Sequence, residues 1–286
     1  MAIPDLRHVY GSVAELNDTL VRGGATVLTD PGNNARKLKM LDEVSRLIDQ
    51  KAHRGTGFGP WVGTRQYDGD GRNVLFLRAD LLDLDDISVR ASQSSDAVEP
   101  VVETDFYLSG LGTYESPFRM VILHGQGTPT TFGQGYRTVE ITGTWSYPFG
   151  THLLAATLDD ALTDSSETAA VTALTEFSAG QTLLIDDEQM HVTATTAGDP
   201  DTITIERGVN GTTAASHLDE APIRRYRYNS SVHTLCLRLA EKRWKARDAG
   251  ADGNDGGGDV GSISLREGED TIIRRMLGPV RLVGVV

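Results

Sequence analysis

The feature that most constrains this chain is a sharp boundary in its charge. Between Asp159 and Glu220 the sequence holds 13 carboxylates and one basic residue, Arg207, which gives that stretch a net charge of −12. The remaining residues hold 26 basic and 27 acidic side chains, for a net charge of only −1. A step of this size predicts a module inserted into another domain. We therefore predict an inserted acidic domain at residues 150–227, and a first domain made of residues 1–149 and 228–286.

The acidic module has the composition of an all-β domain. Leu183 to Ile185, Gln189 to Ala194 and Thr202 to Glu206 are short segments rich in threonine, valine and isoleucine, the residues that favour strands. Turn sequences at Gly198-Asp199-Pro200 and Asn210-Gly211 separate them. The segment therefore predicts an inserted all-β domain.

Helices are predicted on both sides of the module. Ser12 and Glu15 have the spacing of a capping box, and apolar residues recur at helical spacing from Ala35 to His53. Beyond the module, Ser231 to Arg247 and Glu269 to Leu277 have the same periodicity.

Strands are predicted between the second helix and the module. Val62 to Tyr67 and Asn73 to Leu77 flank the turn sequence Asp-Gly-Asp-Gly, which indicates a hairpin. Further strands are expected at Ile87–Arg90, Asp105–Leu108, Phe118–Leu123 and Arg137–Trp145. The fold class predicted for the whole chain is α+β, a helical bundle packed with a small antiparallel sheet, plus the inserted all-β domain.

No motif in the chain predicts catalysis, a metal site or a cofactor site. The sequence lacks nucleophile-elbow, Walker and dinucleotide-binding patterns. The Asp-Gly-Asp-Gly turn has Arg72 where a calcium loop needs an oxygen ligand. The seven histidines have no metal-ligand spacing, and His191 and His217 are expected in turns or at the surface. The single cysteine, Cys236, excludes an internal disulfide.

The chain is expected to be made in a cytoplasm and to have no contact with a membrane. Residues 1–10 lack the apolar region of a signal peptide, and no apolar run reaches the roughly 20 residues needed to cross a bilayer. The overall net charge of −13 argues against general affinity for nucleic acid.

Two segments are candidates for binding a partner. The predicted helix at Ser231 to Arg247 is amphipathic, and its basic side chains either form a solvated face or, in a ring around DNA, contact phosphate or an acidic neighbour. The apolar segment near residue 286 predicts a strand that pairs within its own subunit or adds to the sheet edge of a partner. The candidate residues are Arg238, Lys242, Arg243, Lys245 and Arg247 on the helix, and Val280, Arg281, Leu282, Val283, Val285 and Val286 in the apolar segment.

The order of several short motifs resembles the head-to-tail connector (adaptor) family of tailed bacteriophages. Two predicted helices are followed by Thr-Arg-Gln-Tyr-Asp-Gly at 64–69, Asp-Asp-Ile-Ser-Val at 85–89 and Thr-Asp-Phe-Tyr-Leu at 104–108. The segment 139–147 and the basic helix end the series. The module itself is similar to small β domains of phage structural proteins, through Phe-Ser-Ala-Gly-Gln at 177–181, Ile-Asp-Asp-Glu-Gln-Met at 185–190, Glu-Arg-Gly-Val-Asn-Gly-Thr at 206–212 and His217. The module departs from the family pattern, in which the basic helix follows soon after the last strand.

This resemblance implies a structural protein of the virion neck rather than an enzyme. The expected assembly is a ring, usually twelve-fold, that sits beneath the portal protein, binds a downstream neck or tail protein and surrounds the channel for genomic DNA without reading its sequence. The helices are expected to surround the channel, with residues 280–286 docking on the portal by strand addition.

Two alternatives stay open. The first is a tail-completion or neck protein that binds the tail tube. The second is an accessory protein that binds the host or a glycan through the β domain. Sugar-binding sites favour aromatic platforms, and all three tryptophans, Trp61, Trp145 and Trp244, lie outside that domain, which speaks against this alternative.

Overall fold

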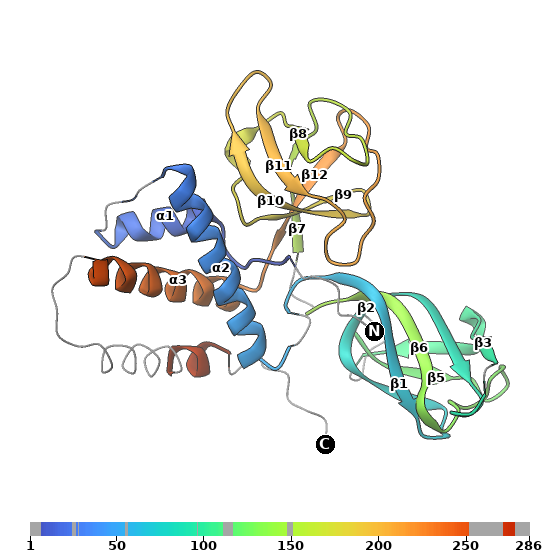
Figure 1. Ribbon diagram of the computed structural model, residues 1–286. Helices are drawn as coiled ribbons and strands as arrows, with labels where there is room; N and C mark the ends of the chain where they lie inside the picture. The colour runs from blue at the N-terminus through green and yellow to red at the C-terminus, as the bar shows by residue number, and fades with distance from the viewer. Residues whose placement is uncertain are drawn as a thin grey trace. The chain divides into compact units, whose positions relative to one another are not determined.

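A computed structural model describes residues 7–24, 27, 29–54, 57–95, 97–110, 117–147, 151–251 and 271–277 (Figure 1). These residues form two compact units. One contains the described residues between 7 and 58 together with those between 151 and 277, and the other contains those between 59 and 147. Each unit has its own six-stranded antiparallel sheet.

The described part of the chain is mostly β, so the predicted helical bundle packed with a small antiparallel sheet is wrong. Twelve strands form the two sheets. The prediction failed partly because one long strand, β2 (Val74–Arg90), has the acidic sequence Asp83 to Asp86 in its middle. That stretch reads as a loop, and the sequence therefore predicts two short segments where the chain forms one continuous strand.

In the unit of residues 59–147, β2 organises the sheet. The strand pairs with β5 from Val74 to Leu81 and with β6 from Leu81 to Val89. Register shifts beside Leu81 and Leu84 accompany the change of partner, and such bulges bend a strand. The other strands are β1 (Trp61–Gly69), β3 (Val98–Pro100), β4 (Phe106–Ser109), β5 (Phe118–Leu123) and β6 (Gly135–Trp145), in the order β1-β6-β2-β5-β4 with β3 on β2.

The predicted hairpin around the Asp-Gly-Asp-Gly turn is also wrong, because β1 and β2 do not pair with each other. Both pair with β6, which lies between them. The backbone of the turn bonds to Phe132, which lies three residues before β6: Gly71 N–H donates to the Phe132 carbonyl, and Phe132 N–H donates to the Arg72 carbonyl. These bonds leave room for β6 between the two strands.

The unit of residues 59–147 has a hydrophobic core of its own. Trp61 and Trp145 face each other across β1 and β6 with ring centroids 6.3 Å apart. The Arg65 guanidinium lies 5.0 Å from the first ring and 5.1 Å from the second, where cation–π attraction offsets its partial burial. Ile87 and Val121 are almost fully buried in the same unit.

In the other unit, the predicted helices are confirmed. The capping box of α1 (Val13–Arg22) is complete, because Ser12 N–H donates to Glu15 Oε2 at 2.8 Å and Glu15 N–H donates to Ser12 Oγ at 3.3 Å. Residues 271–277 are helical as well. The remaining helices are α2 (Pro31–Lys51) and α3 (Ser230–Ala251), and α1, α2 and α3 contact one another.

The second sheet lies between α2 and α3 in the sequence. All its strands fall within residues 150–227, where the sequence predicts an inserted β domain. The strands expected at 183–185, 189–194 and 202–206 are confirmed, whereas β7, β8 and β12 were not foreseen. The strands are β7 (Thr151–Thr157), β8 (Thr168–Ala170), β9 (Thr182–Ile185), β10 (Glu188–Thr196), β11 (Thr202–Glu206) and β12 (Pro222–Arg227), in the order β7-β12-β9-β10-β11-β8. Two short 3₁₀ turns, Glu103–Asp105 in the first sheet's unit and Leu174–Glu176 here, complete the described elements.

The β module has a separate hydrophobic core. Leu158, Leu183, Ile185 and Met190 are fully buried in one cluster, and Phe177 closes it with 6% of its surface exposed.

Among the helices in the described ranges, none is long and apolar enough to cross a bilayer.

Candidate functional site

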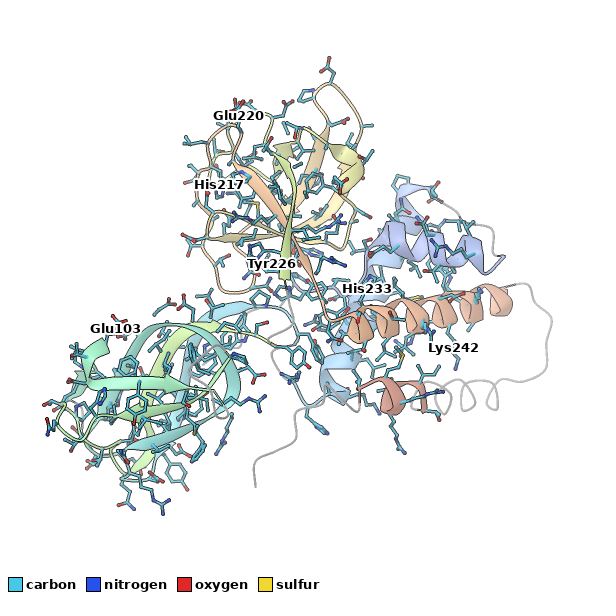
Figure 2. The ribbon with its side chains drawn as sticks, turned by 180° about the vertical axis from the view of Figure 1, so that it is seen from behind. Glu103, His217, Glu220, Tyr226, His233 and Lys242 are labelled. Atoms are coloured by element: carbon cyan, nitrogen blue, oxygen red, sulfur yellow. The ribbon has the colours of Figure 1, made fainter. Side chains whose placement is uncertain are left out.

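The basic side chains predicted as a contact surface all lie on α3. The opposite face of this helix is buried, and Lys242 marks the basic side in Figure 2. Arg238 and Arg247 are exposed, whereas Lys242, Arg243 and Lys245 are half-buried. The buried side chains of the helix are Val232, Leu235, Cys236, Leu239, Ala240 and Trp244.

Lys245 and Arg247 are among the basic side chains that have partners within the unit. Lys245 Nζ lies 2.7 Å from Glu241 Oε1 and donates to the Gly23 carbonyl at 3.4 Å, which ties α3 to the end of α1. The Arg247 guanidinium lies 4.1 Å from the centre of the Trp244 ring. Lys245 therefore also has a structural role, and a contact between α3 and DNA or an acidic neighbour stays a prediction.

A second link joins α3 to the first turn of α1. His233 Nε2 lies 3.1 Å from Glu15 Oε1. Desolvation raises the pKa of Glu15, but hydrogen bonds from His233 and Ser12 outweigh it and lower the pKa to about 2. Glu15 thus completes the capping box and also anchors the start of α3.

The structure contains a buried ion-pair cluster in the β module that sequence reasoning missed. Glu188 is at its centre, with 2% of its surface exposed. Arg207 binds both Glu188 oxygens, with Nε and Nη2 each 2.8 Å away. His217 bridges two carboxylates, with Nε2 2.9 Å from Glu188 Oε2 and Nδ1 2.7 Å from Asp186 Oδ2. The expected surface position of His217 is therefore wrong, since only 4% of this residue is exposed.

Backbone groups complete the cluster. The N–H groups of Gly208 and Ala215 each donate to Glu188 at 2.9 Å, and Arg207 Nη1 donates to the carbonyls of Thr163 and Ser166. Desolvation raises the pKa of Glu188, but hydrogen bonds from Arg207, Ala215, His217 and Gly208 lower it to about 2. The polar groups of Glu188 and Arg207 are thus used internally, and the cluster fastens the loops around 163–166 and 207–217 to β10.

His191 is the second histidine that the sequence places in a turn or at the surface, and it is buried as well. It lies on β10 with 5% of its surface exposed. Desolvation is the largest cause that lowers its pKa to about 4, and the charges of Arg7 and Arg46 act in the same direction. The ring is therefore neutral near pH 7. Alternation along the strand puts His191 on the face opposite the apolar Met190 and Val192, so the local sequence gave no signal that His191 is buried.

The other predicted contact surface, residues 280–286, lies outside the described residues, so its docking on a portal stays a prediction. Within the described ranges, no group of three His, Cys, Asp or Glu side chains is placed to hold a metal ion. No protein-family model, curated protein or solved structure matches this chain.

Proposed function

We propose that this chain is a subunit of the ring that joins the head to the tail in a tailed bacteriophage, and that it acts as a structural protein without catalysis. The observation that carries the proposal is the order of the connector-like motifs along the chain, from the two helices through the segments at 64–69, 85–89, 104–108 and 139–147 to the basic helix. In this reading the ring sits beneath the portal and surrounds the DNA channel.

The packing of the helices supports an inserted module. α1 and α2 precede the second sheet and α3 follows it, yet the three helices contact one another. At their centre, Cys236 Sγ of α3 lies 3.6 Å from Ser45 Oγ of α2. A helical group interrupted in sequence but continuous in space is the arrangement expected when a domain is added to an older one.

The charge distribution suggests how the subunit is oriented in the ring. The β module carries −12 between Asp159 and Glu220, and this charge repels DNA phosphates and keeps a particle soluble when it faces outward. α3 carries the opposite charge, with Arg238 and Arg247 exposed. We propose that α3 faces the channel or an acidic neighbouring subunit, and that the module faces away from the channel.

Negative-stain microscopy of the chain mixed with the portal protein of the same phage tests the function. We expect rings stacked on the portal, while each protein alone serves as the control. The matched variants are Arg238→Glu on α3 and Arg72→Glu, an exposed arginine in the turn after β1. Loss of ring stacking with Arg238→Glu alone would support the contact on α3.

The outcomes that contradict the proposal point to the alternatives. Binding to tail tubes without binding to the portal would indicate a tail-completion protein. Binding of the chain to glycans, without either neck partner, would indicate an accessory protein.

A further inference from the structure

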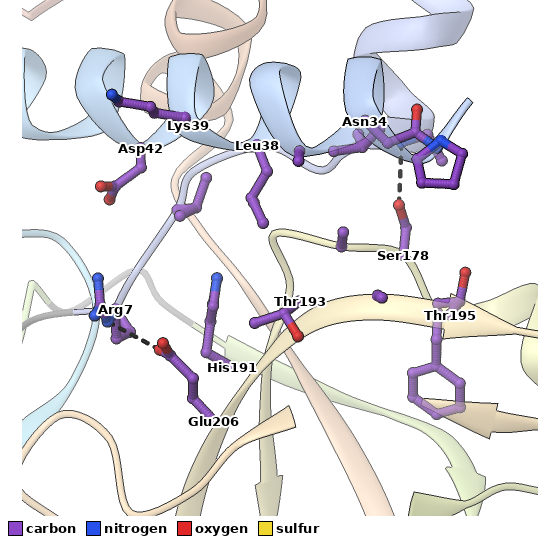
Figure 3. A pocket seen from close by; sticks show the side chains of 18 of the residues that line it. Arg7, Asn34, Leu38, Lys39, Asp42, Ser178, His191, Thr193, Thr195 and Glu206 are labelled. Atoms are coloured by element: carbon purple, nitrogen blue, oxygen red, sulfur yellow. Dashed lines mark hydrogen bonds and ion pairs between the residues drawn. The ribbon is translucent and has the colours of Figure 1, made fainter. Parts of the chain in front are cut away.

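A groove of about 850 Å³ lies within the unit that contains the helices and the β module. Figure 3 shows α2 on one side, with Leu38 and Lys39, and β10 on the other, with Thr193 and Thr195. At one end the Arg7 guanidinium pairs with the Glu206 carboxylate at 2.9 Å. The groove is therefore bordered by a helix along one wall and by a strand along the other.

The strand wall of the groove has an unpaired edge. β10 pairs with β9 only from Glu188 to His191, and Val192 then bonds to residues 180 and 181. Along its other edge β10 pairs with β11 as far as Thr196. Among the residues that the structure describes, no strand or loop makes backbone hydrogen bonds to the second edge at 193–196, and all four of these residues line the groove. An unpaired strand edge is a template for an additional strand.

Two buried hydrogen-bond acceptors line the same groove. His191 extends from β10 toward α2 in Figure 3, and its Nδ1 has no hydrogen-bond partner among the described residues. Oδ1 of Asn34 on α2 is also buried and has no hydrogen-bond partner among the described residues. Buried polar atoms are nearly always paired in proteins. A neutral imidazole has a single N–H, and the His191 ring uses it in a hydrogen bond to the backbone of Arg7. The unprotonated Nδ1 and the amide oxygen of Asn34 therefore both require a donor. The groove therefore fits a ligand that offers N–H groups, as an extended peptide backbone does.

We propose that this groove binds residues 280–286 of a second copy of the chain, which add as a strand along the 193–196 edge of β10. The proposal rests on the ring described above and assigns the contact between neighbouring subunits. Seven extended residues span roughly 23 Å and four span roughly 13 Å at about 3.3 Å per residue, so the segment covers the whole free edge. In an extended strand the alternate residues Val280, Leu282, Gly284 and Val286 would share one face, and all four are apolar. Leu38 and Ala35 give the groove an apolar wall.

The geometry of this contact is head-to-tail. The donating segment and the accepting groove are different surfaces, so one copy can donate to a neighbour while it accepts from another. Such heterologous contacts form a closed ring when the rotation between copies closes.

A synthetic peptide of residues 279–286 tests the groove directly. It is titrated by fluorescence anisotropy against a chain that ends at Pro279, which keeps every described residue. Two further peptides carry N-methyl groups, one on residues 281, 283 and 285 and the other on 282, 284 and 286. A strand added to a single edge uses the N–H groups of alternate residues only. We expect one methylated peptide to lose binding and the other to keep it.

Matched variants locate the binding site. Ala35→Arg places a long side chain in the groove, whereas Val21→Arg makes the same kind of change at an exposed position of α1 outside it. We expect the first variant to weaken peptide binding by about tenfold or more, equivalent to about 1.4 kcal/mol, and the second to leave it unchanged. Circular dichroism checks that both variants are folded. Absence of binding at about 1 mM peptide, or equal effects of the two methylated peptides, would overturn the proposal.

A mixing experiment tests whether the donor is a second copy. The Ala35→Arg chain keeps residues 280–286 but has a blocked groove, while the chain that ends at Pro279 has a free groove and no donor. We expect neither to self-associate and their mixture, at high concentration, to form a one-to-one complex in light scattering. If no complex forms, donation between copies is overturned, and residues 280–286 would then bind the portal or their own chain. Neither assay contains the portal, so failure of this contact can be told apart from failure of the proposed function. If rings stack on the portal but the peptide does not bind, only this contact is rejected. If the peptide binds but no rings form on the portal, only the proposed function is rejected.

Discussion

The surroundings of two buried carboxylates of this chain shift their pKa values in opposite directions. Glu188 accepts hydrogen bonds from Arg207 and two backbone N–H groups, which keep its pKa near 2. Asp49 on α2 is also buried, but its pKa is raised to about 7, because desolvation outweighs the attraction of Arg46 and the hydrogen bond from Tyr10 at 2.5 Å. The number of donors around each carboxylate decides which form is stable.

Replacing Glu188 by glutamine should destabilise the β module strongly. The change leaves Arg207 buried, with 7% of its side chain exposed, and without its charged partner. Removing one partner of a buried ion pair costs about 3–5 kcal/mol. Urea unfolding measures the loss, and Asp187→Asn, the same type of change at the exposed neighbouring position, should stay within about 0.5 kcal/mol of the parent chain. Equal losses for the two variants would show that the cluster contributes nothing.

Asp49 should make the helical group less stable as the pH rises. Between the ordinary pKa of 3.8 and the raised value of about 7, the folded chain keeps a proton that the unfolded chain has released. The unfolded state binds fewer protons there, so the free energy of unfolding falls with rising pH. Relative to Asp49→Asn, the parent chain should lose on the order of 3 kcal/mol between pH 4 and pH 8. Urea unfolding at intervals across this range checks the difference, and parallel curves for the two chains would contradict it.

At the scale of elements, the contact between α2 and α3 depends on small buried side chains. Cys236 and Ser45 are both fully buried where the two helices meet, and Leu41 and Leu239 are fully buried on the same two helices. Burial raises the pKa of the Cys236 thiol to about 12. Its thiolate, the reactive form, is therefore nearly absent near neutral pH.

Cys236 should react with a thiol reagent only when α2 and α3 separate. It is the single cysteine of the chain, so absorbance with a chromogenic disulfide reagent reports on it alone. Val21→Cys in a Cys236→Ala background supplies an exposed thiol as the control, since Val21 is 61% exposed. We expect the control to react at once and Cys236 to react at the rate of unfolding. Similar rates in the absence of denaturant would show that the helices open freely.

At the scale of the whole molecule, the chain forms two units with separate cores. The unit of residues 59–147 begins and ends with strands that pair, since Trp61 is opposite Trp145. The two ends of this unit are therefore adjacent. The other unit holds the helices and the β module together through α1, where Val13 N–H donates to the Ala179 carbonyl at 2.9 Å.

The fragment 59–149 should consequently fold when it is produced alone. We expect dispersed amide resonances and cooperative thermal unfolding. A fragment that ends at Leu123 lacks β6, the strand between β1 and β2, and should be disordered, because it loses the pairing of both strands. A disordered spectrum for the longer fragment would contradict the separation of the two cores.

The sequence alone determined the local elements of this protein. The capping box at Ser12, the apolar periodicity of α2 and the strand at Phe118 to Leu123 were predictable because neighbouring residues form each of them. The segments at 183–185 and 202–206 likewise have local strand patterns. Of the candidate site, the sequence identified the basic side of α3, since that side follows from helical spacing.

Only the tertiary structure decided which elements pair and which polar groups are buried. β2 continues through its acidic middle because bulges let it change partner from β5 to β6, and β1 pairs with a strand some 70 residues away along the chain rather than with its neighbour. The buried positions of His191 and His217 depend in the same way on distant partners, among them Arg7 and Glu188. Contacts between residues far apart in the chain leave no local pattern, because their energy appears only when the fold brings the residues together.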